Sequence, residues 1–285
     1  KYFGSIPRPE RKLDKTYTQE PAQDGERFVT LRRVVEVAAV GAVYHIPAGP
    51  HPEYPAIDVP SLLAELDAFA SQIAFRIDPG VATADLAGSI AEYLFNDVGF
   101  HGNTGEYYSP DNSFLNRVLE TRTGIPITLS LLFMEVGRRL GLKCSGVGLP
   151  GHFIVGIDDT GEYLDPFHAG VSLSVTDCSD LVDSMSGGRL AWTDDFLAPV
   201  SKHNILFRML NNLKSVYMQT GAYYKAVGVI QRQSIMSPGI PSLYQEQAWC
   251  HAEQHEYRLA IRVLESYLEI AKNQGTGGSE DTKQV

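Results

Sequence analysis

The sequence predicts an α+β fold in which helices come first, a small antiparallel sheet follows, and a helical tail ends the chain. Three observations support this order. Apolar residues recur with a helical period between residues 60 and 140, short strand-like segments lie between 143 and 167, and a helical repeat occupies residues 201–272. The chain has 285 residues, 44% of them hydrophobic and 20% charged, so it is long enough for one large core or two domains and typical of a soluble globular protein.

The formal net charge of −10 argues against nucleic acid as a partner, because sequence-independent binding needs a basic surface. Basic residues nevertheless gather between Arg8 and Arg33, where they could contact an acidic partner or form a solvated arm. The longest apolar runs, Val34–Val43 and Ile125–Met134, are far shorter than the roughly 20 residues that span a bilayer. We therefore expect no transmembrane segment.

The N-terminal part of the chain is predicted to be irregular. Residues 1–25 are rich in proline and charge, lack periodicity and are expected to form an extended arm. Residues 28–43 have a helical rhythm. His45–Pro60 contains five prolines and is predicted to be a loop.

The cysteines indicate a reducing compartment. Cys144, Cys178 and Cys250 are odd in number, widely spaced and without a CxxC pair, so neither a disulfide framework nor a zinc cluster is expected. The cytoplasm or an organelle stroma or matrix fits this pattern. A first residue other than Met is compatible with organelle import, with a trimmed chain or with a cleaved tag.

Helices are predicted before the sheet. Pro60 opens the first of them at a favoured first-turn position. Thr83 is expected to cap the second, which runs to Gly99, and a short helix is predicted to begin at Asp111 or Asn112 and to run through Leu119.

The helix predicted from Ile127 to Leu140 has the character of a buried central helix. Pro126 fits its first turn, and Gly141 is expected to end it. Apolar residues occur on every side of it, so we expect neighbours on all faces.

A β-meander is predicted next. Lys143–Leu149, His152–Asp158 and Glu162–Phe167 are short strand-like segments separated by turn residues. Ser184–Gly188 is rich in serine and glycine, and the residue pattern changes after it. We therefore place a domain boundary near residue 200, so that the first domain covers residues 26–199.

The tail, residues 200–272, shows a repeat of 34 residues. Tyr223 and Ala226 recur as Tyr257 and Ala260, and this spacing is the period of TPR repeats. Two repeats are fewer than the roughly three that form an independent solenoid, so the tail is expected to pack on the first domain. Residues 273–285 are polar and expected to be disordered.

Several separated motifs resemble one known family. They are NSFLNRVLETRTGIPITLSLLFMEVGRRLGLKCSGVGLPGHFIVGI (112–157), EYLDPFHAG (162–170), GFHGNTGEYYSPDNSF (99–114) and ILFRMLNNLKSVY (205–217). In this order they resemble the SirB-type transglutaminase-like proteins. The resemblance implies a helical transglutaminase-like core, similar to papain-like cysteine proteases, with a small antiparallel sheet and C-terminal TPR repeats.

Active members of the transglutaminase-like group use a Cys-His-Asp triad. By resemblance, His152 stands at the position of the histidine and Asp165 at that of the aspartate. The nucleophile position falls on Pro126 or its neighbour Ile127, and neither side chain can attack a substrate. None of the three cysteines is an obvious replacement, so His152 and Asp165 are interpreted as vestigial or as a structural pair that fixes a turn.

Two chemical alternatives stay open. Thr128 or Ser130 could act as a hydroxyl nucleophile with His152 as its base, or both could simply cap or back-bond the first helical turn. His168 could join His152 and Asp165 in holding zinc, but the spacing is not diagnostic and no metal is expected. No cofactor is expected either, because the chain lacks a P-loop and a GxGxxG motif.

The loop His101–Pro110, dense in glycine, asparagine and tyrosine, could line a ligand groove or could be a turn filled by its own tyrosines. The candidate binding residues in and near this loop and the central helix are Asn103, Tyr107, Tyr108, Asn112, Thr128 and Ser130.

The sequence therefore favours a non-catalytic transglutaminase-like and TPR protein that binds a protein partner as a scaffold, assembly factor or subunit of a larger complex. One alternative is a hydrolase or acyl transferase that uses Thr128 or Ser130 with His152 and Asp165. Another is a structural subunit of a plastid or mitochondrial assembly, which the basic arm and the first residue suggest.

Overall fold

The computed structural model describes residues 58–78, 80–158 and 160–273. The predicted arm, the helical segment 28–43 and nearly all of the proline-rich loop lie outside these residues, as do residues 274–285. Asn273, which the sequence assigned to the tail end, is the last residue of a helix.

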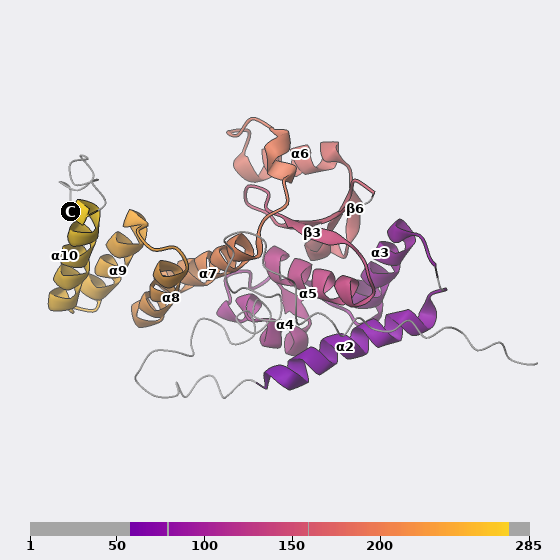
Figure 1. Ribbon diagram of the computed structural model, residues 1–285, viewed down its shortest axis with the longest axis horizontal. Helices are drawn as coiled ribbons and strands as arrows, with labels where there is room; N and C mark the ends of the chain where they lie inside the picture. Colours follow the sequence, from indigo (N-terminus) through magenta and orange to yellow (C-terminus); the bar gives the residue numbers. More distant parts are fainter. Residues whose placement is uncertain (1–57, 79, 159, 274–285) are drawn as a thin grey trace, which may run out of the picture.

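The first two helices of the described chain form an edge of the main domain (Figure 1). Helix α2 (Val59–Arg76) begins with Asp58, whose side chain accepts a hydrogen bond from the backbone of Ser61, and Pro60 lies in its first turn as predicted. Helix α3 (Thr83–Ala91) starts at Thr83 itself, so Ala82 holds the capping position and the prediction that Thr83 caps this helix was wrong. The chain then continues to Asp97 as a π-helix, η2 (Glu92–Asp97).

The segment that leads to the central helix is more broken than predicted. The expected short helix is divided into a 3₁₀ turn, η3 (Pro110–Ser113), and helix α4 (Leu115–Thr121), because Phe114 between them has an extended backbone. Two short strands that the sequence did not predict, β1 (His101–Gly102) and β2 (Thr123–Gly124), pair in parallel on either side of this segment.

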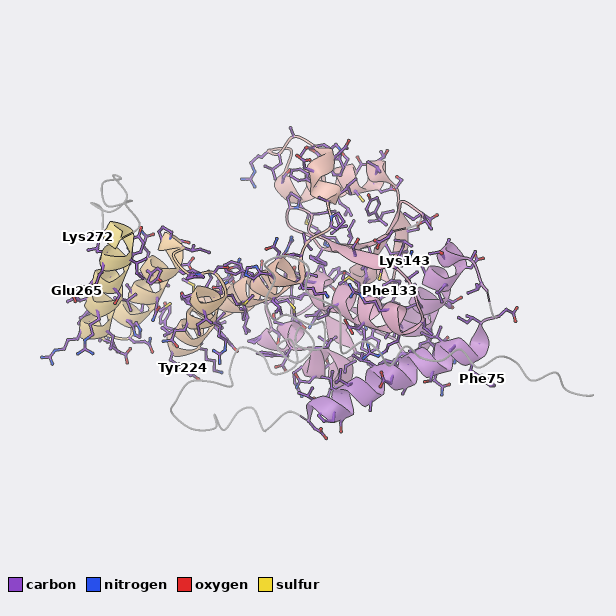
Figure 2. All side chains as sticks on the ribbon, viewed as in Figure 1. Phe75, Phe133, Lys143, Tyr224, Glu265 and Lys272 are labelled. Carbon is purple, nitrogen blue, oxygen red and sulfur yellow. The ribbon has the colours of Figure 1, made fainter. Side chains whose placement is uncertain are left out.

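Helix α5 (Pro126–Arg139) is the centre of the domain, as predicted. Every residue from Pro126 to Gly137 is buried, and Gly141 follows the helix with a φ of 80°. Phe133 lies in the interior, where its ring stacks on Phe95 with 6.4 Å between centroids, whereas Phe75 is 83% exposed (Figure 2). The core side chains of α2, α3, α4, η2 and the sheet gather around α5.

The sheet is antiparallel with strand order β3-β4-β5-β6, so the predicted meander is confirmed. Its strands are β3 (Cys144–Val147), β4 (Ile154–Ile157), β5 (Glu162–Asp165) and β6 (Val171–Leu173). The second strand begins later than predicted, because the backbone N–H of His152 closes a turn onto the carbonyl oxygen of Leu149.

Strand β6 and helix α6 (Val175–Ser186) were not predicted. Helix α6 packs on one face of the sheet through Cys178 and Val182, and a 3₁₀ turn, η5 (Asp194–Leu197), follows it.

The tail consists of α7 (Lys202–Gln219), α8 (Tyr223–Met236), α9 (Pro241–Glu253) and α10 (Tyr257–Asn273), which extend away from the sheet (Figure 1). Helix α7 joins the tail to the domain. Ile205, Leu206 and Met209 belong to the main core, whereas Leu210 and Leu213 belong to a second core with α8 and α9. No described helix is long and apolar enough to cross a membrane.

Gly170 packs closely between the sheet and the first helices, and replacing it should be costly. It has a φ of +72°, and an added Cβ would lie 2.7 Å from the Cβ of Ala91 and 2.9 Å from the ring of Phe95. We expect Gly170→Ala to lower the free energy of unfolding by about 2–4 kcal/mol, since it combines left-handed backbone strain with overpacking. Urea denaturation measures this change.

Gly161→Ala is the matched control for Gly170→Ala. Gly161 has a similar φ of +70°, but an added Cβ would have nothing within 4 Å, so only the backbone strain applies there. Equal losses of unfolding free energy in the two variants would show that the close contacts with Ala91 and Phe95 do not add to the cost of Gly170→Ala.

Candidate functional site

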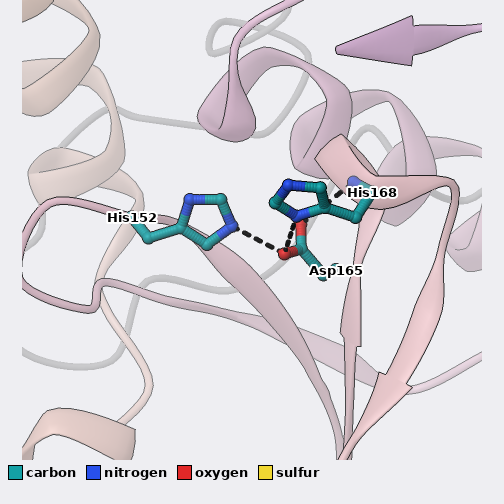
Figure 3. A group of neighbouring side chains, drawn as sticks. All are labelled: His152, Asp165 and His168. Atoms are coloured by element: carbon teal, nitrogen blue, oxygen red, sulfur yellow. Dashed lines mark hydrogen bonds and ion pairs between the residues drawn. The ribbon is translucent and has the colours of Figure 1, made fainter. Parts of the chain in front are cut away.

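His152 and Asp165 meet at one end of the sheet, as their spacing predicted (Figure 3). His152 lies in the turn before β4, and Asp165 is the last residue of β5, the neighbouring strand. His152 Nε2 is 2.8 Å from Asp165 Oδ2, and the two residues are only 2% and 1% exposed. The pair has the His-to-carboxylate contact that orients the histidine in a catalytic triad; its vestigial character stays a prediction.

Asp165 holds more than one partner. Nδ1 of His168 lies 2.7 Å from the same Oδ2 atom, while Oδ1 accepts hydrogen bonds from the backbone N–H groups of Phe167 (3.0 Å) and His168 (3.4 Å). Burial on its own raises the pKa of the Asp165 carboxyl, but the hydrogen bonds and charges of His152 and His168 outweigh burial and bring this pKa below its usual value. The carboxyl is therefore ionised at neutral pH.

The start of α5 presents hydroxyls that are already engaged with backbone. Oγ1 of Thr128 accepts a hydrogen bond from the backbone N–H of Ile125 (3.1 Å) and lies within donating distance of the carbonyl oxygens of Asn112 (2.9 Å) and Ile125 (3.1 Å). Oγ of Ser130 donates to the carbonyl oxygen of Phe153 at 3.4 Å. Both side chains are completely buried. Within the described chain, neither hydroxyl makes a hydrogen bond to His152.

The three cysteines are buried and unpaired. Burial raises the pKa of the Cys144 thiol to about 12 and the pKa values of Cys178 and Cys250 to about 11. Since the thiolate is the nucleophilic form, these thiols are poorly reactive at neutral pH.

Aromatic side chains form a partly exposed surface beside the His152–Asp165 pair. The Phe167 ring meets the rings of His152, His168 and Tyr107 edge-to-face, with centroids 6.0, 5.2 and 6.1 Å away. Tyr107 in turn meets Tyr108 at 5.3 Å. We call Tyr107, Tyr108, Phe167 and His168 the aromatic face; Tyr107 is 37% and Tyr108 64% exposed.

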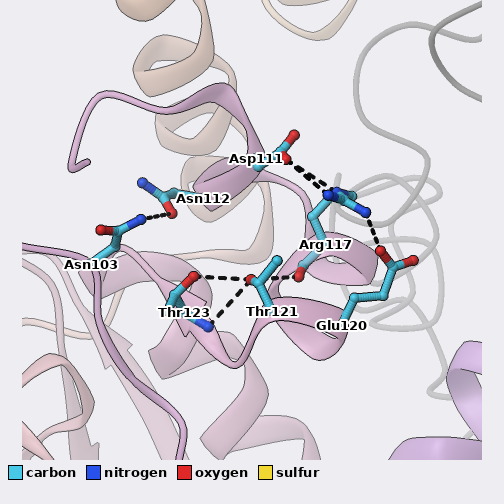
Figure 4. Close-up of polar contacts among 7 residues, drawn as sticks. All are labelled: Asn103, Asp111, Asn112, Arg117, Glu120, Thr121 and Thr123. Atoms are coloured by element: carbon cyan, nitrogen blue, oxygen red, sulfur yellow. Dashed lines mark hydrogen bonds and ion pairs between the residues drawn. The ribbon is translucent and has the colours of Figure 1, made fainter. Parts of the chain in front are cut away.

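Asn103 in the loop and Asn112 just after it hold the shape of the loop (Figure 4). Nδ2 of Asn103 donates to Oδ1 of Asn112 at 2.9 Å, and Nδ2 of Asn112 donates to the carbonyl oxygens of Glu106 and Tyr107 at 2.7 and 3.0 Å. Asn112 is only 2% exposed, so it holds the loop backbone from the buried side.

The six predicted binding residues thus fall into three groups. The two tyrosines lie at the surface beside the His152–Asp165 pair, and the two asparagines support the loop. Thr128 and Ser130 are fully buried and hydrogen-bonded to backbone, so they are not part of an exposed binding surface, contrary to expectation.

Arg208 of α7 is a site residue that the sequence did not single out. Its Nη2 donates to the carbonyl oxygens of Leu149 and His152 at 2.8 and 2.6 Å, and its guanidinium lies 5.5 Å from the centroid of the Phe153 ring. Burial lowers its pKa, and no carboxylate pairs with it in the described chain. The sequence offers one sign that Arg208 is special: this charged residue stands in an otherwise apolar stretch, next to Phe207, Met209 and Leu210.

Comparisons with known proteins agree with this architecture. The chain is 34% identical over 189 residues to a UPF0162 protein of Xylella fastidiosa (strain Temecula1), a match that covers 64% of this chain and 66% of the relative. It is 28% identical over 222 residues to a UPF0162 protein of Pseudomonas aeruginosa, covering 75% of this chain and 82% of the relative. The chain thus spans about two thirds of the length of the Xylella relative.

A third relative, F-box only protein 21 of Mus musculus, is 32% identical over 138 residues, which cover 45% of this chain and 21% of that protein. Residues 60–211 match the sequence profile of the Transglutaminase-like superfamily. This match includes α5, His152, Asp165 and Arg208 and extends over more than half of the chain, and so the chain belongs to the transglutaminase-like superfamily.

Proposed function

We propose that the chain is a non-catalytic transglutaminase-like protein that binds a protein partner at the aromatic face beside His152 and Asp165. The proposal rests mainly on which residues stand in the first turn of α5 and what they bind. By resemblance, the thiol position of active members falls on Pro126 or Ile127, and the Thr128 hydroxyl is bound to backbone groups of Ile125 and Asn112. A histidine with an orienting carboxylate but no nucleophile cannot form a covalent intermediate.

The aromatic face has the composition of a recognition surface. Tyrosine side chains combine apolar rings with a polar tip and are enriched at protein interfaces. Asn112 holds the backbone of Glu106 and Tyr107, and Phe167 approaches Gly102 so closely that a Cβ there would lie 2.6 Å from the ring. A preorganised surface loses less conformational entropy when a partner binds.

The tail supports a binding role on two grounds. Tyr223 begins α8 and Tyr257 begins α10, so the 34-residue period relates the helix pairs α7–α8 and α9–α10, and we propose that they are two TPR-like repeats. Arg208 ties α7 to the His152 turn, so a partner could contact the tail and the aromatic face together.

F-box only protein 21 carries the shared region within a much longer chain, which suits a binding module.

Affinity purification from the native source tests the proposal. Tyr108→Glu places a charge on the aromatic face, and we expect it to reduce recovery of the wild-type partner at least about tenfold, since interface aromatics often contribute more than 1.4 kcal/mol. Phe75→Glu, on a residue that is 83% exposed on α2, is the matched control and should retain the partner. Equal recovery with both variants would contradict the proposed surface.

The hydrolase or acyl transferase alternative has one observation in its favour, the intact contact between His152 and Asp165. His152→Ala separates it from a binding role. A binding protein should keep partner recovery in this variant, whereas loss of a hydrolytic or transfer activity present in the wild type would favour the enzyme.

A further inference from the structure

We propose that His152, Asp165 and His168 form a binding site for a single divalent transition-metal ion of the zinc class. The proposal is independent of the partner-binding function. Its starting point is a feature that a triad does not need: a second imidazole, His168, on the same carboxylate oxygen that His152 already contacts.

The three ligand atoms are close enough to share an ion. Each of the three residues offers one ligand atom, and these atoms all lie within 4.8 Å of one another (Figure 3). His152 Nε2 and His168 Nδ1 are the nitrogens that contact Asp165 Oδ2. Zinc binds imidazole nitrogen and carboxylate oxygen at about 2.0–2.2 Å, so tetrahedral ligands stand about 3.4 Å apart. The two N–O separations of 2.8 and 2.7 Å would have to widen by about 0.6 and 0.7 Å on this geometry.

The backbone prepares this arrangement. Asp165 caps the 3₁₀ turn η4 (Pro166–His168), and residues three apart in a 3₁₀ turn eclipse each other, so His168 lies over Asp165. The pairing of β4 with β5 brings His152 to the same place. Because Oδ1 of Asp165 accepts the backbone N–H groups of Phe167 and His168, the carboxylate is oriented with Oδ2 toward both imidazoles.

Metal binding requires the two contacting nitrogens to lose their protons. Each neutral imidazole can carry its proton on the other ring nitrogen instead. In His168 the other ring nitrogen is Nε2, and this side chain is 53% exposed. In His152 it is Nδ1, which has no hydrogen-bond partner in the described residues. The exposure of His168 also provides a route for the ion from solvent, and the Phe167 ring packs edge-to-face against both imidazoles.

Three protein ligands leave one position of a tetrahedral ion open to water or to a donor group of a partner. Two histidines with one carboxylate suit zinc, iron(II) or cobalt(II) rather than magnesium or calcium, which prefer all-oxygen sites.

The test is a metal titration of the full chain after removal of any affinity tag and treatment with a chelator. Zn²⁺ is titrated in competition with a chromophoric chelator, and Co²⁺ binding is followed by visible absorption. We expect the wild type to bind one equivalent, and His168→Ala to bind at least about 100-fold more weakly, since losing a ligand costs at least as much as losing a second-shell partner.

His101→Ala is the matched control. His101 is exposed, and among the described residues its ring hydrogen-bonds only the carbonyl oxygen of Gly99, so this variant should bind like the wild type. His168→Ala spares the buried His152–Asp165 contact and should stay folded, which circular dichroism checks. Absence of Zn²⁺ and Co²⁺ binding by the wild type, or equal affinity of wild type and His168→Ala, would overturn the proposal.

Discussion

Asp165→Ala is expected to lower the free energy of unfolding by about 3–5 kcal/mol, because several hydrogen bonds to one charged acceptor, each contributing about 1.5–3 kcal/mol, are lost together. The carboxylate accepts from two backbone N–H groups and contacts two imidazoles, and it is 1% exposed. Alanine removes the acceptor of all these groups, and among them the His152 imidazole is buried. Urea denaturation at neutral pH measures the loss.

Two comparisons make the Asp165 prediction specific. Asp165→Asn should cost less than Asp165→Ala, because the amide oxygen still accepts from the backbone. Asp158→Ala removes an exposed carboxylate that contacts Ser145 and should change stability by less than about 1 kcal/mol. An Asp165→Ala loss as small as that of Asp158→Ala would show that the cluster contributes no stability.

The depressed pKa of Asp165 adds a pH dependence with a defined sign. The unfolded carboxyl titrates near its ordinary pKa of 3.8 and the folded one below it. The stabilising contribution is therefore present above pH 3.8 and is lost as the pH falls from there through the folded pKa, since the unfolded state then binds the proton more readily. The stability advantage of wild type over Asp165→Asn should shrink in that acidic range.

Arg208→Ala is the second variant with a large expected effect, a loss of about 2–4 kcal/mol. Hydrogen bonds from charged donors contribute about 1.5–3 kcal/mol each, and this guanidinium donates to the carbonyls of Leu149 and His152 while packing near Phe153. The variant should also speed hydrogen exchange of the His152 amide, which closes the turn onto Leu149.

Arg258→Ala, on the exposed side of α10, is the control for Arg208→Ala and should leave stability within about 0.5 kcal/mol of wild type. Arg208→Lys should recover only part of the loss, because an ammonium on a flexible stem replaces a planar fork. If Arg208→Ala leaves both the stability and the exchange of the His152 turn unchanged, α7 does not support the site.

Local signals were sufficient to predict much of the fold. Pro126 and Gly141 mark the two ends of α5 because each suits one backbone conformation, and the turn residues of the meander separate its strands. The His152–Asp165 contact followed from the adjacency of two antiparallel strands. Each of these features depends on residues close together in the sequence.

The missed features depend on other information. The π-helix after α3 cannot be distinguished from an α-helix by apolar period, and β6 is three residues long with two of them exposed. Helix α6 did carry a local signal, a serine followed three residues later by an acidic residue, and Ser174 and Asp177 form its capping box. Only the other end of this helix, Ser184–Gly188, was interpreted, as a domain boundary. Arg208 reaches a turn more than 50 residues away along the chain, and that contact requires the assembled fold.

The proposal that no working nucleophile lies beside His152 is tested most directly by acylation and peptide mapping. The native chain is incubated with an activated ester in the presence of EDTA, and adducts are located by mass spectrometry. We predict no acyl adduct on Thr128, Ser130 or any of the three cysteines, because the hydroxyls are bound to backbone and the thiols are buried with raised pKa values. An adduct on one of these residues that disappears in His152→Ala would contradict the account.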